Sequence, residues 1–254
     1  MVSKSNAVRR RGPWLAILFG VPAILILLAL GTWQVERLRW KEALIATISE
    51  RTHAAPLPLA DIEARFATSA GVDYWPVIAR GQLLHEGERH FLATHDGQSG
   101  FYIYTPLQLD DGRFAFTNRG FVPYDLKEAG KRPAGQVAGP VTITGLARDP
   151  LAEKPSWVVP DNDPAGNVFY WKDIKAMAAT AGLPEGADVL PFFIEAGDAP
   201  NPGGWPVGGV TIVSLPNSHL QYAFTWYGLA AALLGVMIVG WLKRDRSDGT
   251  GPGV

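Results

Sequence analysis

Two long runs of apolar residues stand near the two ends of the chain. Residues 14–33 and residues 222–241 are each 20 residues long and carry no charged side chain. About 20 apolar residues in a helix are enough to cross a hydrocarbon core of about 30 Å. Tryptophan stands at both ends of the first run and at the end of the second, as is typical of membrane interfaces. The pattern therefore predicts two transmembrane helices.

The helical pattern continues past the first run. Apolar residues recur near helical spacing through residues 34–52, which predicts a helical extension that ends before Pro56 and Pro58. The basic residues before the run and the tripeptide Ala29-Leu30-Gly31 also resemble a cleavable signal peptide. However, the apolar run exceeds the usual length of about 7–15 residues for that type of segment. We therefore interpret the first run as an uncleaved anchor.

Short segments rich in β-branched and aromatic residues fill the region between the runs, separated by Gly, Pro and Asp. Glu86-Gly87 and Asp111-Gly112 are typical of hairpin turns. Helices are predicted at residues 59–66 and 172–181. Strands joined by hairpins without alternating helices favour a mainly antiparallel sheet or a small open barrel. The fold class is thus a membrane-anchored α+β protein, with strands expected at residues 76–84, 89–94, 101–109, 114–117, 141–148, 168–171, 189–195 and 210–215.

The distribution of Lys and Arg predicts the orientation of the spans. Seven basic residues stand outside the two runs, before the first and after the second: Lys4, Arg9, Arg10, Arg11, Lys243, Arg244 and Arg246. The inner flanks carry three, namely Arg37, Arg39 and Lys41. Because the more basic flanks stay in the cytoplasm, both termini are expected there.

This orientation places the middle of the chain on the far side of the membrane. We expect a cytoplasmic N-terminus at residues 1–13, spans at 14–33 and 222–241, and a cytoplasmic tail at 242–254. The periplasmic domain would be residues 34–216, with its helical extension at 34–52 and its β-rich part at 74–215. Thirteen residues before the first span are few for an organelle transit peptide, so a bacterial plasma membrane is expected, with the mitochondrial inner membrane as the alternative.

Composition excludes several classes of function. The 23 Lys and Arg nearly balance the 24 Asp and Glu, so no general attraction to nucleic acid is expected. Cysteine is absent, which excludes disulfides, thiol catalysis, iron–sulfur clusters and covalent attachment of c-type haem. With three methionines and no cysteine, the chain is also a poor carrier of copper(I).

No recognised catalytic motif is present in the sequence. A histidine-rich stretch with acidic neighbours raises the possibility of a metal cluster: His85, Glu86, Glu88, His90, His95 and Asp96. If Glu86-Gly87 is a hairpin turn, His95 points to the opposite face from His85 and His90. We therefore interpret these residues as solvent-facing strand positions, and the chain as not an enzyme.

Two clusters at the membrane boundaries are the candidate sites. On a helix, Trp33, Arg37, Trp40, Lys41 and Leu44 share one side, which also fits an ordinary belt of snorkelling residues. In the second cluster Asn217 is placed to cap the second span and His219 follows in its first turn, with Ala223, Trp226 and Ala230 on one face.

A histidine above small residues leaves space for a flat macrocycle, although a lone interfacial histidine is more often structural. Gly228, Ala230, Ala231, Ala232 and Gly235 give the second span a small-residue side suited to packing against the first.

Taken together, these segments resemble the Surfeit locus protein 1 family of cytochrome c oxidase assembly factors. The resemblance spans nearly the whole chain, including its two terminal spans around one domain. Its opening motif matches Gly31, Trp33, Gln34, Arg37 and Lys41, and its closing motif matches Asn217, His219, Tyr222, Ala223, Thr225 and Trp226. Matches inside the domain are Tyr74, Pro76, Val77, Gly81, Gly100, Thr105, Pro106, Asn118, Arg119, Gly120, Phe121, Val122, Pro123, Gly145 and Arg148; the family more often has Trp where Phe121 stands.

The resemblance implies a chaperone-like role in the respiratory chain, assisting the insertion of haem a into the catalytic subunit of the oxidase. It implies that His219 ligates the haem iron. The residues agree with this: the spans offer an apolar bed, and Arg37, Arg39 and Lys41 offer cations near the propionates. Trp33, Tyr222 and Trp226 complete the expected site. The expected partners are oxidase subunit I, the machinery of haem a synthesis and membrane lipid. Two alternatives stay open: a cofactor-free scaffold for subunit I, and a membrane-anchored periplasmic enzyme.

Overall fold

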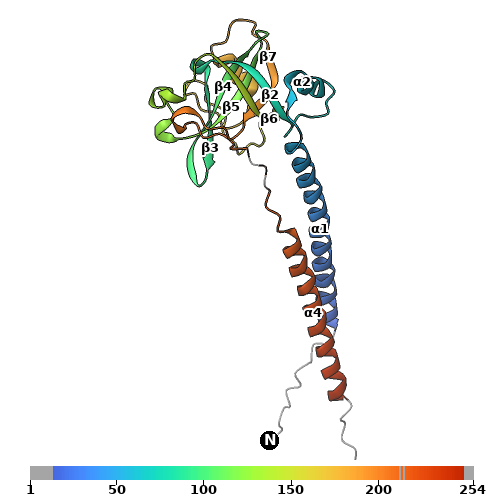
Figure 1. Cartoon of the computed structure of the whole chain (residues 1–254). Helices are drawn as coiled ribbons and strands as arrows, with labels where there is room; N and C mark the ends of the chain where they lie inside the picture. The colour runs from blue at the N-terminus through green and yellow to red at the C-terminus, as the bar shows by residue number, and fades with distance from the viewer. Residues whose placement is uncertain (1–13, 212, 214, 249–254) are drawn as a thin grey trace, which may run out of the picture. The chain divides into compact units, whose positions relative to one another are not determined.

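The structure, a computed structural model, describes residues 14–211, 213 and 215–248 (Figure 1). The expected cytoplasmic N-terminus, with Lys4 and its three neighbouring arginines, lies outside the described residues, as does the end of the expected tail. The chain divides into two compact units, residues 1–46 with 214–254 and residues 47–213. Each unit is described by itself.

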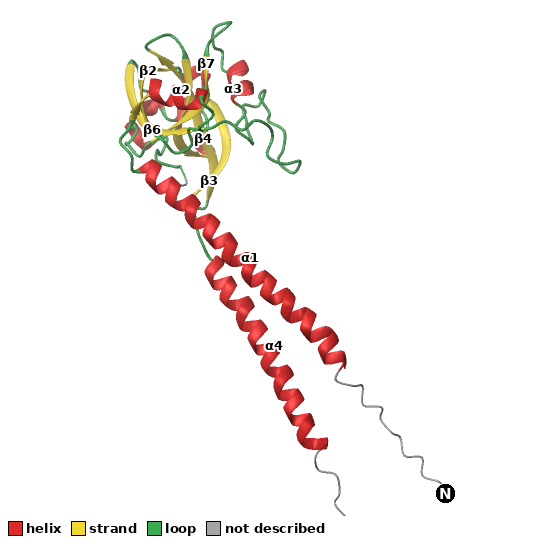
Figure 2. Ribbon diagram, turned by 90° about the vertical axis from the view of Figure 1, so that its right-hand side faces the viewer, coloured by secondary structure: helices red, strands yellow, loops and turns green. Residues whose placement is uncertain are grey.

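The first unit is a pair of long helices. Helix α1 spans Trp14–Thr52 and helix α4 spans His219–Asp248. The two run alongside each other in both ribbon views (Figures 1 and 2). The stretches Ile17–Thr52 and His219–Lys243 are long enough to cross a membrane, and each contains an apolar window of 18 residues, with mean hydropathies of 2.0 and 1.8. The prediction of two membrane-spanning helices is thereby confirmed at the level of length and composition.

Small residues let the two helices approach closely. A Cβ atom placed on Gly31 would lie 2.7 Å from the ring of Tyr227, and one on Gly20 would lie 2.4 Å from the Met237 sulfur. On α4, Ala223 and Ala230 are each only 3% exposed. The expected packing against α1 therefore exists, but it uses these alanines.

Of the five small residues expected in that packing, four are exposed instead: Gly228, Ala231, Ala232 and Gly235. A Cβ atom on Gly228 or Gly235 would meet nothing within 4 Å. These two glycines lie on the outer surface of the helix pair, because a face in contact with α1 needs residues spaced by helical turns, which Ala223, Ala230 and Met237 supply.

The second unit is a small β-barrel. Strands β2 (Pro76–Leu83), β6 (Pro140–Arg148), β7 (Val189–Ala196), β5 (Phe114–Pro123) and β4 (Gln98–Leu109) are neighbours in that order, and pairing of β2 with β4 closes the ring. Strands β1 (Leu57–Pro58) and β3 (Arg89–His95) extend it at β2 and β4. Most pairs are antiparallel, whereas β5–β7 and β1–β2 are parallel. The predicted fold class is confirmed.

Two short helices and several 3₁₀ turns complete this unit (Figure 2). Helix α2 (Leu59–Ala67) buries Ile62 in the barrel core beside Phe192 and Leu107. Helix α3 (Ile174–Thr180) begins at its cap Asp173 and buries Met177 in a second apolar cluster. The 3₁₀ turns are His85–Gly87, Tyr124–Leu126, Ala129–Lys131, Pro133–Gly135 and Pro202–Gly204.

Some predicted strands differ from the structure. Residues 168–171 make only isolated bridges, of which Phe91 with Phe169 is one. Residues 210, 211, 213 and 215 are not in a strand, and the other two of that predicted segment lie outside the described residues. Strand β5 runs six residues further than expected, because Asn118-Arg119-Gly120 is held between β4 and a bridge from Phe121 to Val207.

One hairpin prediction is confirmed and the other is wrong. Asp111-Gly112 joins the antiparallel pair β4–β5. Glu86-Gly87 instead lies in a 3₁₀ turn between β2 and β3, which are not neighbours in the sheet. The actual turn between β3 and β4 is Asp96-Gly97, where both residues have the positive φ that a two-residue hairpin of type I′ requires (48° and 77°).

Candidate functional site

The site is built where helix α4 begins, in the first unit. His219 is the first residue of α4, and the Asn217 side chain accepts a hydrogen bond from its backbone N–H at 3.4 Å. Across the helix pair, the Gln34 Oε1 atom lies 2.8 Å from His219 Nδ1. Gln34 is 9% exposed on α1. Gln34 directly follows the first apolar run and His219 shortly precedes the second. These two residues are 185 residues apart in sequence and meet through this one polar contact.

This contact determines which ring nitrogen of His219 is available. A carbonyl oxygen only accepts hydrogen bonds, so Nδ1 carries the proton and donates it to Gln34. In the uncharged ring, Nε2 then keeps its lone pair and points away from Gln34. Metal-ligating histidines are typically held in this way, with the second nitrogen fixed by an acceptor.

A second polar pair joins the two helices through Thr32, two residues before Gln34, and Tyr227, eight residues after His219. The Thr32 hydroxyl is 3.1 Å from the Tyr227 hydroxyl, and the absent side chain of Gly31 makes room for the tyrosine ring. Thr32 also donates to the Leu28 carbonyl. Together with Gln34, this pair fixes the register of α1 against α4 at the level of His219.

The two aromatic residues predicted on α4 occupy different surroundings. Trp226 is partly buried and follows His219 by two helical turns, about 10 Å along the axis. Its indole Nε1–H is buried without a hydrogen-bond partner among the described residues. Tyr222 is 53% exposed on the surface of the helix. An unpaired buried donor is costly, so Trp226 offers a hydrogen bond that the chain itself does not use.

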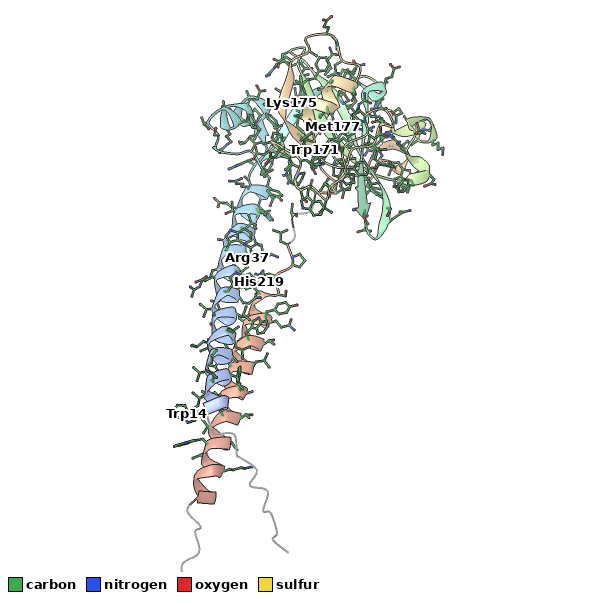
Figure 3. The ribbon with its side chains drawn as sticks, turned by 180° about the vertical axis from the view of Figure 1, so that it is seen from behind. Trp14, Arg37, Trp171, Lys175, Met177 and His219 are labelled. Carbon is green, nitrogen blue, oxygen red and sulfur yellow. The ribbon has the colours of Figure 1, made fainter. Side chains whose placement is uncertain are left out.

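The predicted basic and aromatic residues of α1 flank Gln34. The Arg37 guanidinium lies 3.8 Å from the centre of the Trp40 ring, a cation–π contact that leaves its charge at the surface. Figure 3 shows Arg37 and His219 at the same level of the helix pair. Lys41 is partly buried, two turns beyond Gln34 on the same side of the helix, whereas Trp33 is 53% exposed. Arg37 therefore stands at the level of the histidine, and Lys41 lies about 10 Å beyond Gln34 along α1, in the direction away from the apolar run.

The donor atoms fit a haem ligand, but the expected place for the macrocycle is wrong. Ala223 and Ala230, which were expected to leave space, are buried under α1. A flat ring system cannot occupy that face. Because Nδ1 is turned toward Gln34, a bound iron would approach Nε2 from the opposite side of the imidazole.

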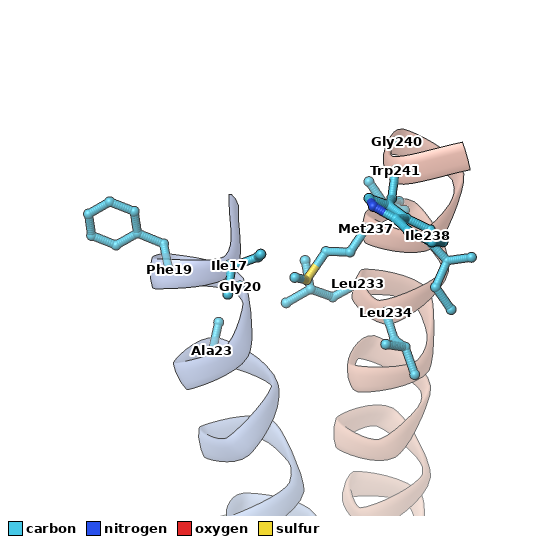
Figure 4. Close-up of a pocket in the computed structure, with 11 residues that line it drawn as sticks. Ile17, Phe19, Gly20, Ala23, Leu233, Leu234, Met237, Ile238, Gly240 and Trp241 are labelled. Atoms are coloured by element: carbon cyan, nitrogen blue, oxygen red, sulfur yellow. The ribbon is translucent and has the colours of Figure 1, made fainter. Parts of the chain in front are cut away.

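A pocket between the two helices lies far from this histidine. It has a volume of about 760 Å³ and is lined by apolar residues of both helices, among them Gly20, Leu233 and Met237 (Figure 4). Met237 follows His219 by 18 residues, which is about 27 Å along a helix. This pocket therefore does not supply the bed of a cofactor ligated by His219.

Two residues of the histidine-rich stretch in the second unit are buried, contrary to the expected solvent-facing positions, whereas His85 and His95 are partly buried and Glu86 and Asp96 are exposed as expected. Glu88 and His90 are 5% and 4% exposed, and Glu88 accepts hydrogen bonds from Arg132 and from His90 Nε2. Burial alone would raise the pKa of Glu88, but the His90 hydrogen bond and the Arg132 guanidinium hold it below its ordinary value. No metal-binding group of three ligands is found among the described residues. Glu88, Arg132 and His90 therefore form a buried structural ion-pair cluster.

Comparison with known proteins gives consistent matches over most of the chain. A model of the SURF1 family matches residues 21–231. Surfeit locus protein 1 of Homo sapiens is 36% identical over 236 residues, which cover 86% of this chain and 74% of the human protein. The Rattus norvegicus protein of the same name is 38% identical over 220 residues, 80% of this chain and 68% of its own length. A SURF1-like protein of Monosiga brevicollis is 34% identical over 262 residues, with 98% and 95% covered.

Proposed function

The chain belongs to the SURF1 family, and we propose that it is a membrane-bound assembly factor for haem a-containing cytochrome c oxidase. Its cargo is haem a, which it holds transiently and passes to the catalytic subunit of the oxidase. It acts as a carrier that binds and orients the cargo, and it performs no bond-making step. Its partners are oxidase subunit I and the enzymes that supply haem a.

The observation that carries this proposal is the hydrogen bond from His219 Nδ1 to Gln34. It leaves Nε2 as the free ligand atom, and haem supplies the iron that an imidazole of this kind ligates. Arg37, at the level of His219 in Figure 3, and Lys41, two turns beyond Gln34 on α1, provide charge-assisted contacts to the two propionates. The unpaired Trp226 N–H is a further donor to the cargo.

We place the β-barrel unit outside the cytoplasm. The seven-to-three excess of Lys and Arg on the outer flanks supports cytoplasmic termini in a bacterial plasma membrane. Because the relatives include human and other eukaryotic proteins, the mitochondrial inner membrane is the alternative. Alkaline phosphatase fused after Asp198 should be active and the same enzyme fused after Arg246 inactive; the reverse pattern would contradict the orientation.

The central experiment compares two histidine variants of the full-length protein in detergent. His219→Ala should purify as a folded, membrane-inserted protein with reduced haem content or a shifted Soret band. Some binding should remain, because the basic and aromatic contacts survive. The matched control is His53→Ala, since His53 is exposed just after the end of α1 and its Nδ1 contacts the Ser49 carbonyl of that helix. A His219 variant with full haem and an unaltered spectrum would make His219 structural.

A deletion strain separates assembly from synthesis. Difference spectra of its membranes should show less haem a-containing oxidase while haem a itself is still made. Complete loss of haem a would indicate a biosynthetic role instead, and an unchanged oxidase would refute the proposal. If the oxidase is lost but the purified protein never contains haem, the cofactor-free scaffold is the better description.

A further inference from the structure

Arg119 carries a buried positive charge without a carboxylate partner. It is 3% exposed and lies in the middle of β5. The other buried arginine of this region, Arg132, is paired with Glu88. Among the described residues, no Asp or Glu oxygen lies within ion-pair distance of Arg119. A buried guanidinium is costly unless an anion compensates it.

The neutral partners of Arg119 satisfy only part of its hydrogen-bonding capacity. Its Nη2 atom donates to the Gly135 carbonyl and, at 3.1 Å, to the Asn201 side-chain oxygen. Its Nη1 atom lies 3.5 Å from His85 Nδ1, a long contact. Because His85 Nε2 is 2.8 Å from the Val137 carbonyl, Nε2 carries the ring proton and Nδ1 is a neutral acceptor. Of the five N–H groups of an arginine, these contacts use three.

The surrounding charges do not neutralise Arg119. Burial lowers its pKa to about 10, while Glu88 raises that pKa and Arg132 lowers it. The group is still charged at neutral pH. Burial is also the first cause that lowers the pKa of His85, which favours the neutral ring, and a neutral ring does not compensate the charge of Arg119. The region holds two buried guanidinium groups and one carboxylate, which is already bound to Arg132.

This uncompensated cation borders a pocket. The pocket has a volume of about 280 Å³ and lies entirely within the β-barrel unit, between the first half of β6 and the segment after β7. Arg119 and Asn201 supply polar groups of its wall, and the apolar part comes from side chains such as Val141, Ile143 and Pro200. Its size is close to the lower limit of about 300 Å³ for ligand pockets.

The local backbone explains why the cation and the pocket meet. Gly120, with φ of 125°, has no side chain, and a Cβ atom there would lie 1.9 Å from the Val207 carbonyl oxygen. Residues 205–209 therefore pack directly on β5, with two hydrogen bonds between Phe121 and Val207. The Asn201 amide donates to the Pro206 carbonyl at 2.6 Å, which holds its oxygen against Arg119.

We propose that this pocket binds a small organic carboxylate with an apolar body, whose carboxylate pairs with Arg119. One guanidinium matches one carboxylate in charge and in its planar two-point geometry. A phosphate dianion would need more positive charge than this wall offers, and a neutral ligand would leave Arg119 uncompensated. The carboxylate belongs either to a free short-chain acid or to the C-terminus of a peptide. This site is independent of the haem site proposed at His219.

The test uses the full-length protein in detergent and sodium butyrate as the probe. Butyrate should raise the melting temperature of the β-barrel, followed by tryptophan fluorescence, in a saturable manner with millimolar affinity. Butyramide and sodium chloride at matched ionic strength should not. Arg119→Lys keeps the charge but loses the planar fork, and should weaken butyrate binding about tenfold or more. The matched control is Arg113→Lys, because Arg113 already binds Glu63 and Asp111 and does not border this pocket.

The outcomes separate a binding site from a structural arginine. Equal effects of butyrate and chloride, or an unchanged response in Arg119→Lys, would overturn the proposal, as would binding of phosphate without butyrate. If that variant does not fold, nuclear magnetic resonance of the wild-type protein decides. Butyrate, but not butyramide, must then shift the amide signals of Thr142 and Asn201. A competition experiment distinguishes a peptide C-terminus from a free acid as the natural ligand. If the ligand is a chain end, a short apolar peptide with a free C-terminus should displace butyrate, whereas the amidated form of the same peptide should not.

Discussion

Replacing Gln34 with alanine should weaken the binding of haem at His219 without touching the ligand itself. The change removes the acceptor that lies 2.8 Å from His219 Nδ1, in a position where Gln34 is only 9% exposed. The N–H of the imidazole would then be left unpaired, or the ring would turn or change its tautomer. Each of these outcomes lowers the fraction of molecules in which Nε2 is presented correctly.

The expected size of the effect follows from two independent estimates. Leaving a buried donor unpaired costs about 1–3 kcal/mol. Removing the partner of a metal-ligating histidine typically lowers metal affinity about 10–100-fold. Since about 1.4 kcal/mol corresponds to a factor of ten, the two ranges agree. We therefore expect Gln34→Ala to raise the apparent Kd for haem by between one and two orders of magnitude.

The assay is a haem titration of the full-length protein in detergent, followed by the Soret band. Gln221→Ala is the matched control, because Gln221 is an exposed glutamine of α4 and should leave the Kd unchanged. The double variant of Gln34 and His219 should bind no more weakly than His219→Ala alone, since Gln34 acts through the histidine. Wild-type affinity in Gln34→Ala, or losses that add fully in the double variant, would refute this reasoning.

Three further changes test the surroundings of the two sites. Exchanging both Arg37 and Lys41 for Gln should raise the haem Kd about tenfold or more while the spans stay inserted, because charge-assisted contacts are each worth about 1.5–3 kcal/mol. Unaltered haem occupancy in this double variant would mean that the two residues only snorkel to the membrane surface. Gly31→Val should overpack the helix pair by about 1–3 kcal/mol and lower its melting temperature by circular dichroism, whereas Gly228→Val, in open space, should not. Glu88→Gln should destabilise the barrel by about 3–5 kcal/mol in urea unfolding at pH 7, because a buried arginine loses its partner. The lowered pKa of Glu88 means that its stabilisation is complete above the unfolded-state value of about 4.3 and is lost as pH falls through the folded-state pKa, so the gap to the wild type should shrink in acid.

Periodicity made the large elements of this protein predictable. Twenty-residue apolar runs, alternation in the strands and the Asp111-Gly112 turn are local signals, so the two spans and most strands follow from the order of residues. Local signals also misled in identifiable ways. Asn118-Arg119-Gly120 looks like a break, yet it continues β5 because neighbouring strands supply its hydrogen bonds. Asp96-Gly97 carries the stronger hairpin signal and forms the turn between β3 and β4, whereas Glu86-Gly87 lies in a 3₁₀ turn.

The candidate site likewise has features that the sequence predicts and features that only the tertiary structure decides. The sequence alone determined that a histidine, two cations and several aromatic residues stand at the membrane boundary, and that the chain resembles one family. Only the tertiary structure decided that Gln34 orients His219, that α1 covers Ala223, and that Arg119 stands buried beside a pocket. These facts depend on which residues far apart in the chain become neighbours, and that is decided by packing of whole elements, whose contacts leave no periodic trace in the sequence.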